Sequence, residues 1–352
     1  MADAPRIAVL PALPRGDEAE RIGRSPRPAR GDGAGEHQLD TSADRQRSTV
    51  TRAGVTSPLG FALAAAVEAG GGVVVDPGDA DALVWTDHAD PAGLGAVLDE
   101  HPHLRWVQLP WAGVEPYVEV IRAHADRTWT CGKGVYAEPV AEHALALALA
   151  GMRGLDRYAR ARSWTRPRGR NLIGARVTIV GGGGIAEALL RLLDPFGCDV
   201  TVVRRTPRPM PGAARVVADA DLDVALTGTD LVVLALPLLP ATDRLLDARR
   251  LGLLADGACL VNVARGRHVV TDDLVAALRD GRLGSAGLDV TDPEPLPGGH
   301  PLWDLPNALV TPHTGNTPQM AVPLLTARVR DNVGRWAAGE PLVGPVDPAA
   351  GY

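Results

Sequence analysis

The stretch Val177-Thr-Ile-Val-Gly181-Gly-Gly-Gly-Ile-Ala186 decides the fold of this 352-residue chain. Its β-branched start predicts a buried strand, and the residues after Gly184 predict a helix. The glycines between them fit the pattern G-x-G-x-x-G/A of a dinucleotide-binding turn. Gly181 permits the tight turn, Gly183 lets a pyrophosphate approach the backbone, and Ala186 keeps helix and strand close. We therefore predict that the dinucleotide phosphates are bound by Gly181, Gly183, Gly184 and Ile185.

The end of the next strand, predicted over residues 199–204, indicates which dinucleotide binds. A protein that binds NAD usually carries Asp or Glu about 20 residues after the glycines, where it holds the ribose 2′-hydroxyl. This chain has Arg204, Arg205 and Thr206 there. Because arginine binds phosphate oxygens through paired charge-assisted hydrogen bonds, we predict that NADP(H) is preferred and NAD(H) is possible. The alternative is that Arg204 or Arg205 is only a solvated surface charge.

Strands and helices alternate on both sides of the glycine-rich turn, which predicts two parallel α/β sheets. We expect two Rossmann-like, doubly wound domains. Before the turn we predict helices at 59–69, 91–100 and 139–152, and strands at 72–76, 82–85 and 105–110. From the turn onward we predict strands at 176–181, 199–204, 230–237, 258–264, 285–290 and 308–311, with helices at 185–196, 271–280 and 319–338.

The apolar helix near residue 139 marks the predicted change of domain. We assign residues 150–316 to an NAD(P)-binding Rossmann domain and 139–149 to an interdomain helix. The substrate, or catalytic, domain is discontinuous and takes residues 1–138 and 318–352. Residues 14–53 contain almost no large apolar side chain, so we predict a disordered insertion there.

Composition excludes several classes of protein. A net charge of −6 argues against a general nucleic-acid binder, and no apolar stretch approaches the ~18 residues of a membrane span. The three cysteines are isolated and show no metal-site spacing, so we expect neither a disulfide framework nor a metal. We expect a cytoplasmic protein.

Further motifs follow the glycine-rich turn in a specific order. They include Val-Asn-Val-Ala-Arg265-Gly, Gly287-Leu-Asp-Val-Thr-Asp-Pro-Glu294-Pro, and Thr311-Pro-His313, and earlier stretches at 108–114 and 135–144 belong to the same set. With them the chain, from about residue 82 onward, resembles the D-isomer-specific 2-hydroxyacid dehydrogenases. Within that family we expect the glyoxylate/hydroxypyruvate reductase type.

The resemblance implies reduction of a 2-keto acid to a D-2-hydroxy acid, with a catalytic group of three residues. His313 would donate the proton, Glu294 would orient the imidazole, and Arg265 would bind the substrate and polarise its carbonyl. The backbone at Ala112, Gly113 and Val114 would bind the substrate carboxylate. Further cofactor contacts would come from Pro237, Ala264, Asp289 and Gly315, and a homodimer is expected.

Two alternatives stay open at this point. One is an enzyme like phosphoglycerate dehydrogenase, and the other is a dinucleotide-sensing regulatory protein without turnover. Among single residues, we interpret His143 as a packed or hinge histidine rather than a catalytic group. Trp85 and Trp111 could line the substrate pocket or belong to the core.

Overall fold

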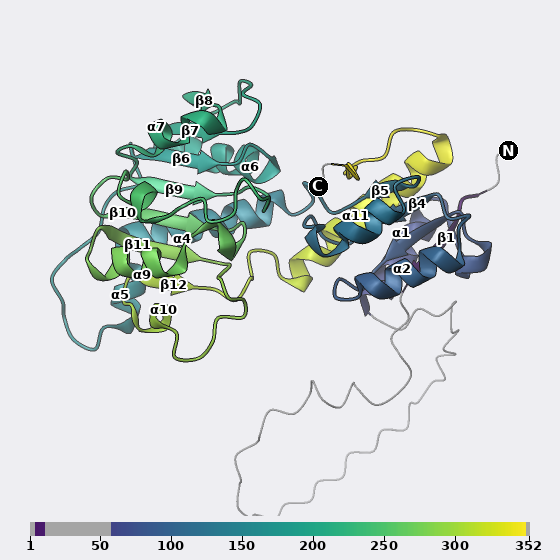
Figure 1. The fold of residues 1–352 in the computed structure, drawn as a ribbon, viewed down its shortest axis with the longest axis horizontal. Helices are drawn as coiled ribbons and strands as arrows, with labels where there is room; N and C mark the ends of the chain where they lie inside the picture. The colour runs from purple at the N-terminus through teal and green to yellow at the C-terminus, as the bar shows by residue number, and fades with distance from the viewer. Residues whose placement is uncertain (1–3, 11–57, 350–352) are drawn as a thin grey trace, which may run out of the picture.

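The computed structural model describes residues 4–10 and 58–349, which form two α/β lobes (Figure 1). The first lobe contains a sheet in the order β2-β1-β3-β4-β5, and every pairing in it is parallel. Its strands are β1 (Arg6–Leu10), β2 (Val73–Val74), β3 (Ala82–Trp85), β4 (Trp106–Gln108) and β5 (Thr128–Thr130). The predicted insertion at 14–53 lies outside the described residues.

The second lobe contains a parallel sheet in the order β12-β11-β10-β9-β6-β7-β8. Because the chain runs outward from β6 in one direction and from β9 in the other, the strand order reverses between them, which is where such sheets bind ligands. The strands are β6 (Arg176–Val180), β7 (Asp199–Val203), β8 (Arg215–Val217), β9 (Leu231–Leu234), β10 (Ala258–Asn262), β11 (Leu283–Leu288) and β12 (Ala308–Val310). Two parallel α/β sheets confirm the predicted fold class.

Helices cover the sheets of both lobes (Figure 1). The first lobe has α1 (Pro58–Ala69), α2 (Pro91–Glu100), α3 (Val118–Ala123) and the C-terminal α11 (Pro318–Ala338). The second lobe has α4 (Ala137–Arg153), α5 (Leu155–Arg160), α6 (Gly184–Leu193), α7 (Leu222–Leu226), α8 (Ala248–Leu251), α9 (Thr271–Arg279) and α10 (Pro301–Asp304). The last helix returns to the first lobe, where Leu325, Val329 and Val333 pack with Leu63 and Val67 of α1.

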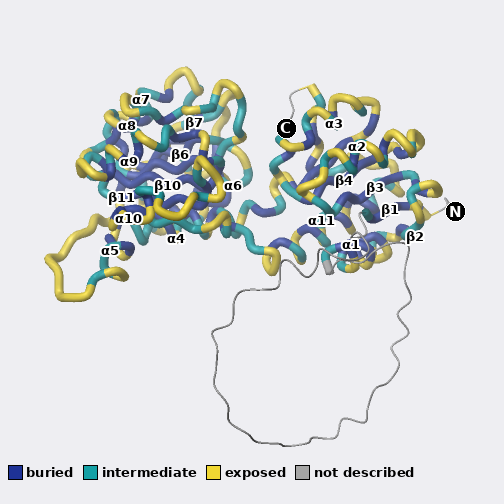
Figure 2. The backbone as a smooth tube through the Cα atoms, turned by 60° about the horizontal axis from the view of Figure 1, so that its bottom comes forward, coloured by how far each residue is buried: buried dark blue, intermediate teal, exposed yellow. Residues whose placement is uncertain are grey.

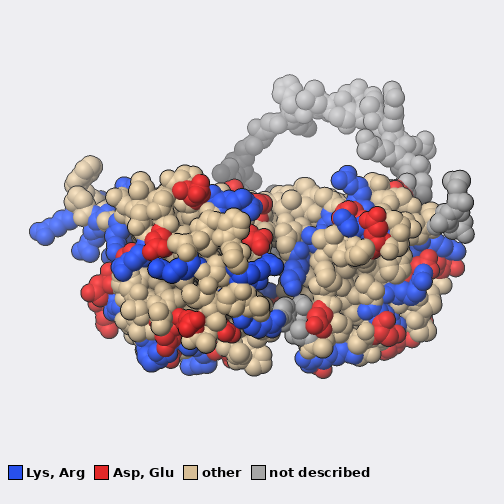
Figure 3. All heavy atoms as spheres, turned by 90° about the horizontal axis from the view of Figure 1, so that it is seen from above, with Lys and Arg blue, Asp and Glu red and all other residues tan. Residues whose placement is uncertain are grey.

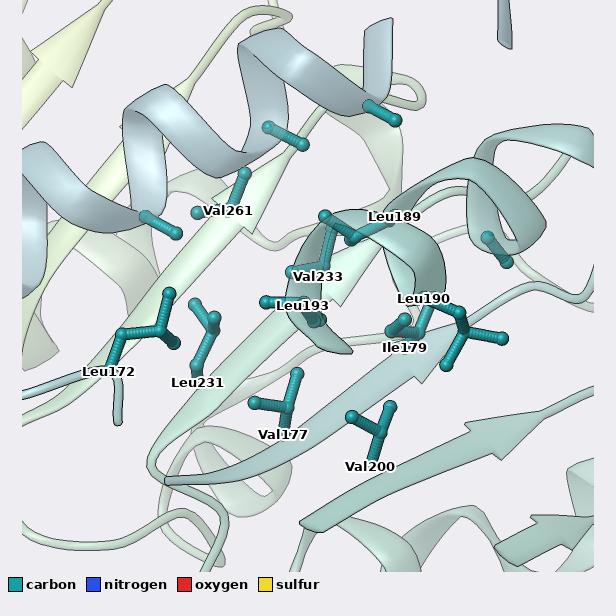
Figure 4. Packing of buried hydrophobic residues seen from close by; sticks show 14 of the residues in the cluster. Leu172, Val177, Ile179, Leu189, Leu190, Leu193, Val200, Leu231, Val233 and Val261 are labelled. Carbon is teal, nitrogen blue, oxygen red and sulfur yellow. The ribbon is translucent and has the colours of Figure 1, made fainter. Parts of the chain in front are cut away.

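The core of the second lobe positions the glycine-rich turn. Val177 and Ile179 of β6 pack against Leu189 and Leu193 of α6, and α4 lies across the same cluster (Figure 4). Burying one such side chain contributes about 1.5–3 kcal/mol. Figure 2 shows the strands of each lobe as buried inside a more exposed shell of loops and helices.

Several elements differ from the sequence-based expectation. The helix expected over 185–196 ends as an α-helix at Leu193 and continues as the 3₁₀ turn Asp194–Phe196, because Pro195 has no N–H to continue the α-helical pattern. The strand expected at 72–76 shrinks to β2, and helix α5 was not predicted.

Two further searches covered the described residues only. In residues 4–10 and 58–349, every helix is too short or too polar to cross a bilayer. The same residues include no group of three or more His, Cys, Asp or Glu side chains placed to hold a metal ion.

Candidate active site

The three residues of the predicted catalytic group follow three adjacent strands of the second lobe. Arg265 comes after β10, Glu294 after β11 and His313 after β12. Backbone hydrogen bonds join these strand ends, since Asp289 N donates to Asn262 O at 3.0 Å and His313 N donates to Asp289 O at 2.9 Å. The carboxyl edge of the sheet therefore gathers all three residues.

His313 and Glu294 form a hydrogen-bonded pair. The Nδ1 atom of His313 lies 2.7 Å from Oε1 of Glu294, and the imidazole remains more than half exposed. Because the carboxylate accepts at Nδ1, the ring is oriented with Nε2 left for proton exchange. The backbone of His313 has a φ of 53°, a conformation that its N–H bonds to Asp289 O and Thr311 O support.

Arg265 is held in a tight turn. The side-chain amide of Asn262 donates to Arg265 O at 2.9 Å, and its oxygen accepts from Ala264 N at 3.0 Å. A Cβ at Gly266 would lie 1.9 Å from Thr291 O, so glycine is needed for this turn to approach the loop that carries Glu294. The backbone that follows Arg265 therefore lies against the loop that carries Glu294.

The loop after β4 provides donors next to Arg265. Within the described part of the chain, the N–H groups of Ala112, Gly113 and Val114 donate to no protein acceptor. A Cβ at Gly113 would lie 2.0 Å from Nη2 of Arg265, so this backbone directly contacts the guanidinium. Free N–H groups beside a cation suit a carboxylate.

The two tryptophans left open by the sequence differ in their surroundings. Trp85 is buried in the core of the first lobe. Trp111 is partly exposed, and its ring lies 5.5 Å from that of Tyr136. Trp85 therefore belongs to the core, whereas Trp111 adjoins the loop at 112–114.

The glycine-rich turn has the geometry of a phosphate site. Gly181 adopts a φ of 114°, and a Cβ there would lie 2.1 Å from Ala235 O. The N–H groups of Gly182 and Gly183 donate to no acceptor in the described chain, and Gly184 and Ile185 open helix α6. A helix N-terminus with unpaired N–H groups attracts anions, so this turn fits a pyrophosphate.

Arg204 lies over the turn from the end of β7. A Cβ at Gly182 would lie 2.8 Å from Arg204 Cδ, and Nη1 of Arg204 is buried without a hydrogen-bond partner. A buried guanidinium nitrogen normally has a hydrogen-bond acceptor, and an oxygen of a 2′-phosphate would supply one for Nη1 of Arg204. On the face seen in Figure 3, Lys and Arg side chains also gather where the two lobes meet, which suits anionic ligands.

The other predicted cofactor residues have varied surroundings. Arg205 and Thr206 are exposed after β7, and Ala264 is buried in the Arg265 turn. Pro237 is exposed after β9, and its carbonyl accepts from Thr242 Oγ1 at 2.9 Å.

Asp289 and Gly315 hold the His313 loop. The buried carboxylate of Asp289 accepts from Thr311 Oγ1 at 2.6 Å, Thr314 N at 2.8 Å and Gly315 N at 2.9 Å, and His143 Nε2 lies at 3.2 Å. Burial opposes ionisation of Asp289, but these donors outweigh it and lower its pKa to about 2. Contact of Asp289 and Gly315 with the cofactor stays a prediction.

Sequence reasoning assigned no role in the site to four residues that lie around it. Asn262 and Thr311 lay inside the quoted motifs, but no role was assigned to their side chains. His143, interpreted as packed, joins the Asp289 cluster, and its Nε2 lies 3.0 Å from Thr311 Oγ1. Glu115, which directly follows the loop at 112–114, pairs with Arg265 at 3.2 Å, and no local pattern signals that contact.

Comparisons with known proteins indicate the family to which the chain belongs. Residues 143–315 match the family model "D-isomer specific 2-hydroxyacid dehydrogenase, NAD binding domain". Glyoxylate/hydroxypyruvate reductase A of Serratia proteamaculans is 32% identical over 294 residues, which cover 78% of this chain and 90% of that protein.

Two solved structures are similar over most of their length. A D-isomer specific 2-hydroxyacid dehydrogenase from Xanthobacter autotrophicus, in complex with NADPH and MES, is 32% identical with a TM-score of 0.69, and the match covers 84% of this chain and 95% of that one. The NADPH-dependent glyoxylate/hydroxypyruvate reductase of Sinorhizobium meliloti, in complex with NADP and sulfate, is 26% identical with a TM-score of 0.71 and coverage of 83% and 96%. This chain therefore belongs to the D-isomer-specific 2-hydroxyacid dehydrogenases, a family of NAD(P)-dependent oxidoreductases.

Proposed function

We propose that this protein reduces a 2-keto acid of the glyoxylate or hydroxypyruvate type to a D-2-hydroxy acid, with NADPH as the preferred cofactor. The observation that carries the proposal is the His313–Glu294 pair, which lies with Arg265 at one edge of the sheet. The relatives named as glyoxylate/hydroxypyruvate reductases support the substrate class.

Each group in the site has a task that its geometry suits. The N–H groups at 112–114 and the Arg265 guanidinium bind the substrate carboxylate, and Arg265 also polarises the carbonyl. His313 gives the proton on Nε2 to the carbonyl oxygen, and Glu294 holds the ring through Nδ1. When bound, NADPH supplies the hydride that the carbonyl carbon receives.

The proposed cofactor contacts rest on hydrogen-bond donors that suit phosphate groups. The N–H groups of Gly182 and Gly183 and the start of α6 bind the pyrophosphate, and Arg204 binds the 2′-phosphate through its unpaired Nη1. Domain boundaries at 138/139, 149/150 and 316/318 are part of the same proposal. The homodimer and the cytoplasmic location stay predictions.

Steady-state oxidation of NADPH at 340 nm tests the proposed activity. Glyoxylate, hydroxypyruvate, pyruvate, phenylpyruvate and 3-phosphohydroxypyruvate are compared, each with NADPH and with NADH. We expect turnover with NADPH that is highest for glyoxylate or hydroxypyruvate. Highest turnover with the phosphorylated substrate would favour the phosphoglycerate dehydrogenase type, and no turnover by a chain that binds NADPH would favour the sensing protein.

Replacing Arg204 with alanine is expected to change cofactor preference. A charge-assisted hydrogen bond contributes about 1.5–3 kcal/mol, so kcat/KM for NADPH should fall about 10–100-fold while that for NADH changes little. Arg215→Ala is a matched control, because Arg215 lies on the neighbouring strand and pairs with Asp199 at 3.2 Å. Equal losses with both cofactors in Arg204→Ala would contradict the 2′-phosphate assignment.

A further inference from the structure

His268 is a buried histidine that the proposed reaction does not use. It is fully buried at the end of the 3₁₀ turn Gly266–His268, which directly follows Arg265. Its Nδ1 atom lies 2.8 Å from Thr242 O, and its Nε2 atom lies 3.2 Å from Leu236 O. These two carbonyls belong to the two ends of the loop at 236–242, which follows β9. The imidazole therefore connects both ends of one loop.

The protonation state of the His268 ring decides how many of these contacts are hydrogen bonds. Both partners are carbonyl oxygens, so a ring nitrogen must carry a proton to bond either of them. Burial lowers the pKa of His268 and the charge of Arg265 adds to this effect, whereas the two carbonyls and Asp243 oppose it. At neutral pH the ring is therefore neutral, and the shorter contact assigns its proton to Nδ1, which donates to Thr242 O. In the charged form, Nε2 donates to Leu236 O as well.

The loop at 236–242 lies where a dinucleotide would bind. It leaves the carboxyl end of β9, which is next to β6 in the sheet, and the strand order reverses between these two strands. Parallel sheets bind ligands outside the carboxyl ends of the strands at such a point. A Cβ at Gly181 would lie 2.1 Å from Ala235 O and 3.1 Å from Leu236 N, so the glycine-rich turn contacts the start of this loop. The loop thus adjoins the proposed pyrophosphate site.

The loop has internal bonds, and His268 attaches it to another part of the lobe. Thr242 Oγ1 accepts from Leu239 N at 2.8 Å, and Thr242 N donates to Leu239 O at 2.9 Å. These bonds involve loop residues only. His268 joins the loop to the turn that follows β10, and Arg267 of the same turn pairs with Asp243 just beyond the loop at 2.6 Å. Of these two attachments, the one through His268 is buried.

We propose that His268 is a positioning residue that holds the loop at 236–242 in the conformation that the dinucleotide binds. A loop that is already ordered loses less conformational entropy on binding, so the affinity is higher. Because the loop adjoins the pyrophosphate site, the effect concerns a part that NADPH and NADH share. The inference rests on the proposed cofactor contacts and is independent of which 2-keto acid is reduced.

Titration with each cofactor, followed by the fluorescence of the bound nicotinamide, tests the inference without turnover. His268→Leu keeps a similar volume but removes both ring nitrogens. We expect its dissociation constants for NADPH and for NADH to rise by the same factor, about tenfold. This result differs from that of Arg204→Ala, for which only the affinity for NADPH should fall.

Two further substitutions at the same position separate hydrogen bonding from packing. His268→Gln keeps an N–H that can donate to a carbonyl, and it should bind both cofactors within about threefold of the wild type. His268→Met has no N–H, and its flexible side chain adapts to the same space, so it should behave as His268→Leu does. It also provides the comparison if His268→Leu does not fold.

Hydrogen–deuterium exchange without cofactor measures the order of the loop itself. Amides within 236–242 should exchange faster in His268→Leu than in the wild type, and close to the wild-type rate in His268→Gln. In the wild type, saturating NADH should slow the exchange of the same amides. Unchanged exchange on addition of NADH would show that the cofactor does not bind on this loop, and would overturn the inference without any variant.

Asn307→Leu is the matched control for loss of a buried donor. Asn307 is buried in the same lobe, directly before β12, and its Nδ2 donates to Leu278 O at 3.0 Å. It lies at the amino end of its strand, whereas the loop at 236–242 leaves the carboxyl end of β9. The control should change neither the cofactor constants nor the exchange of this loop.

Three outcomes of the titrations would contradict the role of His268. They are unchanged constants for both cofactors in His268→Leu, a loss confined to NADPH, and an equal loss in Asn307→Leu. The proposed function can fail separately. Absence of turnover with every 2-keto acid would remove the reductase and leave the cofactor titrations valid, whereas turnover with unchanged constants in His268→Leu would remove only the role of His268.

Discussion

Replacing His313 with asparagine is expected to lower kcat about 10²–10⁴-fold, the range that general acid catalysis supplies. Asparagine can still donate a hydrogen bond toward Glu294, but it has no proton to give to the carbonyl oxygen. The fold should persist, since the His313 side chain is more than half exposed and its backbone N–H bonds are retained. The measurement is kcat for NADPH oxidation with glyoxylate at saturation, beside the affinity for NADPH, which should stay the same.

His300→Asn provides the matched control for this variant. His300 precedes α10, where its Nδ1 accepts from Leu302 N at 3.2 Å, and asparagine is also a good N-cap. We expect it to keep nearly full kcat. If His313→Asn retained activity close to that of His300→Asn, another group would have to donate the proton.

Local patterns were sufficient to predict the fold class and the strand ends of the site. The β-branched run of β6 followed by glycines predicts the phosphate turn, and the alternation of strands and helices predicts strands that end before Arg265, Glu294 and His313. Each of these features depends on a few consecutive residues and on the rule that parallel strands end at one edge of a sheet. The grouping of these three residues and the pairing of His313 with Glu294 followed from the family resemblance.

Contacts between distant segments were not predictable from the same patterns. Glu115 and Arg265 are 150 residues apart, and their contact depends on how the two lobes meet. Helix α5 lies in a polar, arginine-rich run, and Arg160 at its end donates to Leu305 O and Ala308 O of the sheet region. In both cases tertiary contacts decide the structure, and such contacts cannot be predicted from the periodicity of the residues.

The cluster around Asp289 is a third contact of this kind, and its stability should depend on pH. The pKa of Asp289 is lowered to about 2 in the fold from a usual value of 3.8, so its ionised form stabilises the folded state at any pH above the usual value. That contribution is lost as pH falls through about 4 to about 2. Its size at neutral pH is about 2 kcal/mol, from about 1.4 kcal/mol per pKa unit.

Asp289→Asn is therefore expected to lower the free energy of unfolding by about 2 kcal/mol or more at pH 7, and by much less near pH 2.5. The amide replaces one acceptor oxygen by a donor, which faces the N–H of Thr314 if it replaces Oδ1 or the N–H of Gly315 if it replaces Oδ2. Either arrangement loosens the loop that carries His313. We expect kcat to fall with it. Urea unfolding at pH 7 and at low pH measures the change in the free energy of unfolding. Thr311→Val is the control, because it removes one donor but keeps the carboxylate, and it should lower the free energy of unfolding less at pH 7. If Asp289→Asn lowered the free energy of unfolding equally at both pH values, the negative charge of Asp289 would not stabilise the loop. The packing of the Asp289 side chain would then be the only stabilising factor.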